Sequence, residues 1–255
     1  MRWLRLGYKL PAVVLTTVFF AAIPAAFRLV APGRHRAIGR VGAACCRLWG
    51  KAMCAILSVR RDVLGPVPRE GAFLVASNHV SYIDILVLAS LYPSHFLAKR
   101  EIASWPVFGW IARSAGTVFI DREQAKDVVR AGRELAHRLE LGLPLTIFPE
   151  GRSSRGEQIL PFQPSLLEPA ARAGVPCWAA SISYETEGSS LAPSRTICWY
   201  DSESLTTHFP RLLGLKRVFA RVRFAETPVL SVDRKVLAST LWEQATASFT
   251  PIRQD

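Results

Sequence analysis

The stretch AFLVASNHVSYIDILVLASL, residues 72–91, places an Asn-His pair and a single aspartate between two apolar runs. This order predicts a buried strand, a tight turn and a helix, which is the unit that builds α/β folds. His79 and Asp84 lie five residues apart at that turn, so an imidazole lies beside a carboxylate that can orient it. We predict that His79 takes a proton from a hydroxyl. No nucleophile elbow, such as a G-x-S-x-G turn with its serine, accompanies the pair. This hydroxyl is therefore expected to belong to a substrate.

From residue 71 onward, short apolar runs alternate with helix-like segments. The alternation predicts an α/β fold with a mixed, largely parallel sheet flanked by helices. The last predicted strand alternates arginine with apolar residues, as expected of a half-exposed strand near an edge. The predicted strands are residues 73–77, 96–98, 117–120, 145–148, 177–184, 196–200 and 218–224. The predicted helices are residues 83–91, 123–141, 165–173 and 232–249.

Positive charge is concentrated at the N-terminus. Residues 1–61 hold 11 of the 32 basic residues and no acidic one, and the 21 basic residues that follow nearly balance the 20 acidic ones. This distribution favours anionic membrane lipid as a partner. It argues against nucleic acid, which would require basic charge on the folded domain. We therefore predict a membrane-anchoring helical segment at residues 1–62 and an α/β domain at residues 63–255.

Residues 10–27 form an uncharged, largely apolar stretch, which as a helix would be roughly 27 Å long against a hydrocarbon core of roughly 30 Å. A signal peptide has a similar layout, but no A-x-A cleavage site follows. The five cysteines have no metal-ligand spacing and fit a reducing compartment. We favour an uncleaved anchor in the inner (plasma) membrane with the active domain on the cytoplasmic side. The sequence leaves open whether the anchor spans the bilayer or dips into it.

Residues 38–59 carry apolar side chains at helical spacing along one arc, which consists of Ile38, Val41, Cys45, Leu48, Ala52, Ala55, Ile56 and Val59. A separate arc is purely basic and consists of Arg36, Arg40, Arg47 and Lys51. A helix of this kind suits a membrane surface and would complete an N-terminal membrane-associated helical hairpin. The alternative is a helix packed on its own domain with a solvated basic face. The absence of acidic residues from the polar face favours lipid.

Two further predicted strands end in candidate binding residues. Arg122 follows residues 117–120, and its planar fork suits a phosphate at the carboxyl end of a parallel strand. Pairing with its acidic neighbours is the structural alternative. Glu150 and Gly151 follow residues 145–148 and would supply a carboxylate and an accessible backbone N–H. Taken singly, each motif also fits an ordinary turn, and the first also fits a histidine satisfied locally with an aspartate capping the next helix.

Together and in this order, the motifs resemble the lysophospholipid acyltransferase family typified by bacterial 1-acylglycerol-3-phosphate acyltransferases. The resemblance covers residues 71–227 and includes FLAKREI (residues 96–102), WPVFGW (residues 105–110) and LPF (residues 160–162). The N-terminal part is similar to the two-helix membrane element of some members.

The resemblance implies that His79 is the general base toward a glycerol hydroxyl and that Asp84 holds the imidazole in the useful tautomer. It implies a lysophospholipid acceptor and an acyl thioester donor, either acyl-CoA or acyl carrier protein. The alkoxide would attack the thioester directly, with no acyl-enzyme, metal or cofactor. The implied acceptor-binding residues are Asn78, Arg122, Glu150, Gly151 and Arg152.

One position departs from the family pattern. Members often carry threonine and then arginine after the glutamate–glycine pair, whereas here Arg152 comes first and Ser153 follows. The displaced guanidinium leaves the acceptor open between 1-acyl-sn-glycerol-3-phosphate, which would give phosphatidic acid, and another lyso-lipid such as lyso-ornithine lipid. The intact His79/Asp84 pair argues against a non-catalytic lipid-binding protein. A hydrolase using the same base would consume thioester without forming a lipid product.

Overall fold

The structure, a computed structural model, describes residues 2–104, 108–200 and 203–255. A seven-stranded sheet in the order β1-β7-β6-β2-β5-β3-β4 forms its centre. β6 and β7 pair antiparallel, and the other neighbouring pairs are parallel, which confirms the predicted fold class. The strands are β1 (Val59–Leu64), β2 (Leu74–Ser77), β3 (His95–Lys99), β4 (Val118–Ile120), β5 (Leu145–Ile147), β6 (Cys177–Glu187) and β7 (Arg217–Phe224).

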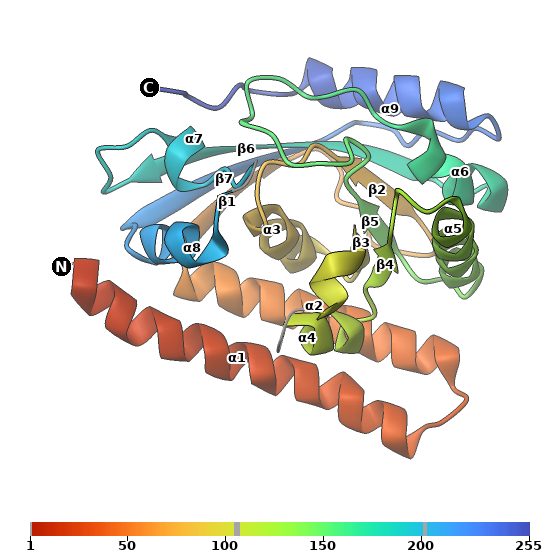
Figure 1. The fold of residues 1–255 in the computed structure, drawn as a ribbon. Helices are drawn as coiled ribbons and strands as arrows, with labels where there is room; N and C mark the ends of the chain where they lie inside the picture. Colours follow the sequence, from red (N-terminus) through yellow and green to blue (C-terminus); the bar gives the residue numbers. More distant parts are fainter. Residues whose placement is uncertain (1, 105–107, 201–202) are drawn as a thin grey trace.

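Helices cover both faces of the sheet, with α9 on one side and the N-terminal helices on the other (Figure 1). Side chains alternate along each strand. Val75 therefore enters one apolar core, with α2 and α3, while Leu74 and Ala76 enter a second core with α5, α6 and α9. The helices are α1 (Arg2–Val30), α2 (His35–Ile56), α3 (Ile83–Leu91), the 3₁₀ helix η1 (Arg100–Ser104), α4 (Phe108–Ser114), α5 (Ala125–Glu140), α6 (Pro164–Ala173), α7 (Pro193–Thr196), α8 (Leu205–Leu213) and α9 (Arg234–Ala247).

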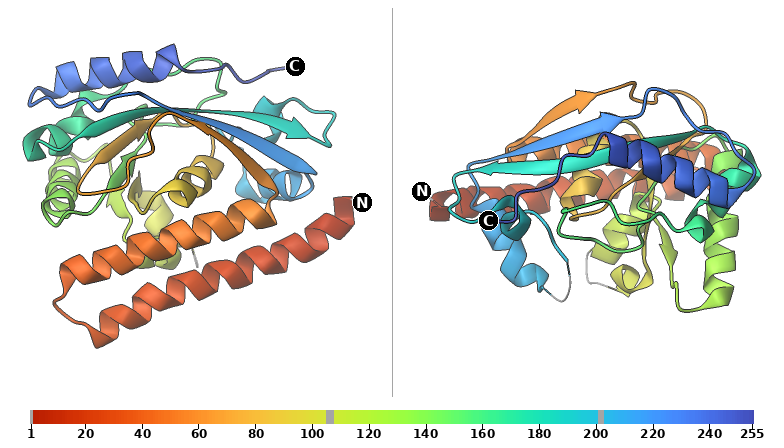
Figure 2. Two further views of the ribbon diagram at one scale, coloured as in Figure 1. Left: turned by 180° about the vertical axis from the view of Figure 1, so that it is seen from behind. Right: turned by 90° about the horizontal axis from the view of Figure 1, so that it is seen from above.

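α1 and α2 form the predicted hairpin, which lies along one side of the domain (Figures 1 and 2). α2 packs on α3 through small residues. A Cβ atom on Gly50 would lie 2.8 Å from both the Leu86 carbonyl oxygen and the Ser90 nitrogen, so the two helix backbones approach closely at this point. Its buried residues are Gly39, Gly42, Ala43, Cys45, Cys46, Gly50, Met53 and Cys54. The buried face is thus centred on different residues from the predicted apolar arc, whose Leu48 is 51 % exposed.

Polar contacts hold α1 against the domain. Arg5 donates to the Gly214 carbonyl (3.1 Å), and the buried Lys9 ammonium donates to the Leu215 carbonyl (3.2 Å). Within the hairpin, the Trp49 indole N–H donates to Thr17 Oγ1 (3.1 Å). The span Leu4–Val30 is long and apolar enough to cross a membrane, and it is the one such span among the described residues. The predicted boundary after residue 62 falls inside β1, so the sheet already begins within the segment assigned to the anchor.

Several elements differ from their prediction. The predicted strand at residues 196–200 is wrong, because Thr196 ends α7 and the residues after it form a loop. β1 was not predicted, and its first residue, Val59, was assigned to the end of the preceding helix. β7 has the expected half-exposed alternation but lies inside the sheet rather than at its edge, because β1 covers it. Helices α4 and α8 were not predicted. Part of the motif at residues 105–110 lies outside the described residues.

Candidate active site

The predicted His79–Asp84 pair forms in the turn between β2 and α3. His79 Nδ1 lies 2.8 Å from Asp84 Oδ2. Asp84 is fully buried, whereas the His79 side chain is 22 % exposed. When Nδ1 carries the proton that it shares with the carboxylate, Nε2 is the ring nitrogen with a free lone pair. The pair therefore presents a base oriented by a carboxylate.

Asp84 receives three further hydrogen bonds. The backbone N–H groups of Val80 and Ser81 donate to its Oδ2 at 2.7 and 2.9 Å, and the Tyr184 hydroxyl donates to its Oδ1 at 2.7 Å. A buried carboxylate requires such partners, because removing its charge from water is otherwise very unfavourable. The same bonds fix the direction in which Asp84 holds the His79 ring.

The His79 ring is also held by stacking. It lies on Phe148, with ring centroids 4.1 Å apart and an interplanar angle of 17°. Ser154 N–H donates to the His79 carbonyl (2.9 Å), which ties the turn to the loop after β5. The imidazole is therefore fixed on one side by Asp84 and on one face by an aromatic ring.

Asn78 points into the domain. Its side chain accepts from Ile182 N–H (2.7 Å) and donates to the Ile182 carbonyl (3.0 Å), and the residue is 1 % exposed. Both halves of the amide are used by β6, so this side chain positions the turn that carries His79. The structure thus gives Asn78 a positioning contact where the sequence predicted an acceptor-binding one.

The remaining predicted residues gather at the same edge of the sheet. Because β2, β5, β3 and β4 are parallel neighbours, the residues that follow β2, β4 and β5 meet at one carboxyl edge. Arg122 follows β4 and donates to the carbonyl of Gly151. Gly151 has φ +81°, and a Cβ there would lie 2.9 Å from the Arg122 guanidinium, so glycine fits this close approach. Arg122 is exposed, and so is Arg152, which directly follows Gly151 in the sequence.

Glu150 is the unusual group of this turn. It is 4 % exposed, and neither carboxyl oxygen has a hydrogen-bond partner of regular geometry among the described residues. Burial raises the pKa of Glu150 to about 8, and the nearby Asp84 adds to this effect. The N–H groups of His79 and Leu160 and the Arg152 guanidinium lower the pKa by less than burial raises it. Glu150 therefore retains its proton at neutral pH, beside the His79–Asp84 pair.

Two residues of this site were missed from the sequence. Tyr184 lies in the middle of β6, where strand periodicity predicts an inward side chain but gives no indication of its partner 100 residues earlier. Phe148 ends the predicted strand at residues 145–148, yet its stacking on His79 depends on the β2–β5 register. Neither contact has a local sequence signal.

Comparison with known proteins agrees with this geometry. The sequence model of the Acyltransferase family matches residues 60–183. The 1-acyl-sn-glycerol-3-phosphate acyltransferase of Neisseria meningitidis serogroup B is 37 % identical over 178 residues, covering 69 % of this chain and 68 % of the relative. The chain belongs to the lysophospholipid acyltransferase family. It is an acyltransferase, as the sequence predicted.

Two further relatives bear on specificity and fold. The lyso-ornithine lipid O-acyltransferase of Pseudomonas aeruginosa is also 37 % identical, over 193 residues that cover 75 % of this chain and 73 % of that one. The crystal structure of the 1-acyl-sn-glycerophosphate acyltransferase PlsC from Thermotoga maritima superposes with a TM-score of 0.60 at 22 % identity and covers 95 % of both chains. This acyltransferase thus shares its fold with that enzyme over nearly its whole length.

We predict that Tyr184→Phe lowers kcat of this acyltransferase by about tenfold with little change in KM. The reason is that a hydrogen bond to a charged group contributes roughly 1.5–3 kcal/mol, and here it fixes the carboxylate that orients His79. Steady-state kinetics provide the measurement. Tyr92→Phe is the matched control, because it removes another buried hydroxyl, bonded to Thr146, outside the site. Equal kcat values for the two variants would contradict the positioning role.

The pKa of Glu150 predicts how stability depends on pH. Between about pH 4.5 and pH 8, the unfolded chain has released a proton from Glu150 that the folded chain retains. The contribution of the protonated Glu150 to the free energy of unfolding is therefore fully present below about pH 4.5, and it is lost as the pH rises to about 8. We expect the Tm of wild type minus that of Glu150→Gln to fall across this window in thermal melts. Glu157→Gln, an exposed change in the same loop, should give a constant difference; a constant difference for Glu150→Gln would contradict its burial as a neutral acid.

Proposed function

We propose that this acyltransferase transfers an acyl chain from an acyl thioester to the free hydroxyl of 1-acyl-sn-glycerol-3-phosphate, giving phosphatidic acid. The observation that carries the proposal is that His79 and the exposed arginines, Arg122 and Arg152, share one edge of the sheet. A base and a phosphate-binding pair at one edge match an acceptor that carries both a hydroxyl and a phosphate.

The proposed reaction needs a single base. His79 Nε2 takes the hydroxyl proton, and the oxygen forms a bond to the thioester carbon. The C–S bond then breaks, and the leaving thiolate takes the proton back from the imidazolium. Asp84 stabilises the imidazolium while it exists. The route uses acyl-CoA or acyl carrier protein as co-substrate and needs no acyl-enzyme, metal or cofactor.

Arg122 would hold the phosphate in this scheme. One of its N–H groups is engaged by the Gly151 carbonyl, which fixes the guanidinium and leaves its other donors for a ligand. Lyso-ornithine lipid is the second candidate acceptor, because a relative with that named activity is as similar as the first. Arg152 lies one residue earlier than the arginine of the usual family pattern. This shift is the feature that favours lyso-ornithine lipid as an alternative acceptor.

We expect His79→Ala to lower kcat by about 10²–10⁴-fold, the usual contribution of a general base. Arg122→Ala should raise KM for 1-acyl-sn-glycerol-3-phosphate about tenfold, because it removes a charge-assisted hydrogen bond. The measurement is acyl transfer from labelled acyl-CoA in detergent, with this acceptor or a lyso-ornithine lipid.

Arg69→Ala, in an exposed loop, is the control and should behave as wild type. Labelled product with the lyso-ornithine acceptor alone would retain the base and the reaction but overturn the proposed acceptor. Wild-type turnover by His79→Ala would overturn the mechanism.

We further propose that α1 anchors the enzyme in the cytoplasmic face of the inner membrane. Its outward side is apolar, with Leu15 71 % and Phe19 60 % exposed. The basic residues of α2, of which Arg36, Arg40 and Lys51 are exposed, suit anionic lipid. The contacts of Arg5 and Lys9 with the turn after α8 keep the first turns of α1 against the domain, which favours a helix lying in one leaflet.

We expect Leu15→Ser/Phe19→Ser to weaken binding to phosphatidylglycerol-containing vesicles more than tenfold, since each buried side chain contributes roughly 1.5–3 kcal/mol. Vesicle flotation of the full chain is the measurement. The Tm in detergent should remain near that of wild type, because both side chains are exposed. Leu191→Ser, an exposed change in another loop, is the control. Unchanged flotation of the double variant would place the anchor elsewhere.

A further inference from the structure

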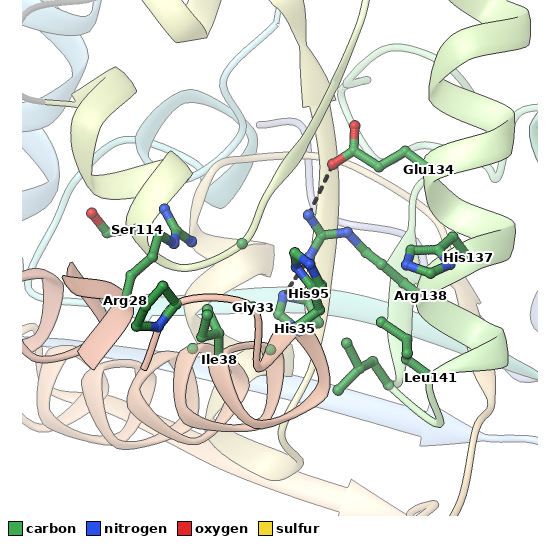
Figure 3. Close-up of a pocket in the computed structure, with 15 residues that line it drawn as sticks. Arg28, Gly33, His35, Ile38, His95, Ser114, Glu134, His137, Arg138 and Leu141 are labelled. Carbon is green, nitrogen blue, oxygen red and sulfur yellow. Dashed lines mark hydrogen bonds and ion pairs between the residues drawn. The ribbon is translucent and has the colours of Figure 1, made fainter. Parts of the chain in front are cut away.

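A cavity of about 430 Å³ lies beside the tip of the α1–α2 hairpin, and this volume is within the range of small-ligand sites. Figure 3 shows that the hairpin tip, the end of α4, the start of β3 and the last turns of α5 surround it. His95 begins β3, whereas His79 follows the end of β2, and both strands run parallel to β5. The cavity therefore lies at the opposite edge of the sheet from the catalytic pair.

Small and apolar residues form most of the lining of this cavity, and arginine and histidine side chains form most of the polar part. Arg28 lies in the last turn of α1, His35 begins α2, and Arg138 lies in the last turn of α5. Among the described lining residues, Glu134 is the single acidic one, and its carboxylate is already bonded by Arg138 (2.9 Å) and Arg130 (3.1 Å). The cavity thus has more positive charge than its one carboxylate neutralises.

In the part of the chain that the structure describes, the Arg138 side chain and the start of α2 both have N–H groups without an acceptor. Arg138 Nε is buried and has no hydrogen-bond partner among the described residues, while Nη2 of the same guanidinium donates to Glu134. α2 begins at the cavity. The side chain of its N-cap residue, Arg34, accepts no hydrogen bond from the N–H groups of the first helical turn. The free N–H groups of an uncapped helix N-terminus are satisfied by the oxygens of an anion, and the Arg28 and Arg138 guanidinium groups add positive charge beside them.

The surroundings of the cavity indicate where this anion comes from. Leu29 and Val30 directly follow Arg28 at the hairpin tip and are 82 % and 78 % exposed. Exposed apolar side chains next to a basic cavity match the boundary between acyl chains and headgroups. We propose that the cavity binds the phosphate of an anionic phospholipid headgroup, as a second lipid site separate from the catalytic one. The bound lipid would hold the hairpin tip and α5 together at the membrane surface.

The test measures binding of short-chain lipids to the full chain in detergent. Dihexanoylphosphatidic acid, dihexanoylphosphatidylcholine and inorganic phosphate are titrated in turn, and bound ligand is followed by equilibrium dialysis. All variants carry Arg122→Ala, which weakens any phosphate binding at the catalytic edge. We expect the phosphatidic acid to bind more tightly than the other two ligands. Arg28→Gln should weaken this binding about fivefold, and Arg28→Gln/Arg138→Gln at least tenfold, as expected for basic residues beside an anionic headgroup.

Arg133→Gln, an exposed change on α5 outside the cavity lining, is the control and should leave binding unchanged. Arg28 is itself exposed, so its variant tests the cavity without disturbing the Arg138–Glu134 pair. Equal affinity for the phosphatidylcholine, or equal binding by Arg28→Gln and Arg133→Gln, would overturn the proposal. Saturation by inorganic phosphate without affinity for lipid would identify free phosphate as the occupant and overturn the lipid assignment. Each result is independent of which acceptor the catalytic site uses.

Discussion

The burial of the Asp84 carboxylate is the constraint on which the catalytic half of this enzyme depends. A carboxylate removed from water must be surrounded by donors, and here they come from His79, from the N–H groups of Val80 and Ser81, and from Tyr184. The β2–α3 turn and the β2–β6 pairing must both be in place to supply them. The Asn78 side chain joins the same turn to β6 through two hydrogen bonds with the backbone of Ile182. The interactions that make His79 an oriented base are therefore also interactions that hold the fold together.

The parallel strands supply the second requirement, which is to bring distant residues to one edge. Arg122 and Gly151 are far apart in sequence, yet the residues following β4 and β5 meet because β3 lies between these strands in the same direction. The positive φ of Gly151 then admits the Arg122 guanidinium. Glu150 lies beneath this turn as a neutral acid, so it adds little negative charge near a phosphate held by Arg122.

The sequence predicted the parts of the fold whose signals are local. Residues 83–91 were predicted with the observed helix bounds, and the strands at residues 145–148 and 218–224 were within one residue of the structure. The error at residues 196–200 has a physical cause. This run is rich in apolar and aromatic residues, but Trp199 N–H donates to the Val80 carbonyl and its own carbonyl accepts from Ser153. The segment is thus a loop that connects the turn after β2 with the loop after β5, rather than a strand.

Long-range contacts explain the rest of what the sequence could not predict. β1 has mostly exposed charged residues, so only its pairing with β7 reveals it as a strand. The pairing of His79 with Asp84 was predictable from their spacing, whereas Tyr184 and Phe148 reach these two residues only through strand register. Asn78 lies next to His79 in the sequence, but the direction of its side chain is set by Ile182 of β6, which lies 104 residues further along the chain.

The N-terminal hairpin is part of the catalytic domain rather than a detachable anchor. Cys46, Met53 and Cys54 of α2 belong to the same core as α3, the helix that carries Asp84. At Gly50 the backbones of α2 and α3 approach so closely that a Cβ atom would not fit. A displacement of α2 is therefore transmitted directly to α3, because packed backbones are hard to compress. The proposed membrane contact of the hairpin and the geometry of the His79–Asp84 pair are thus linked by one helix interface.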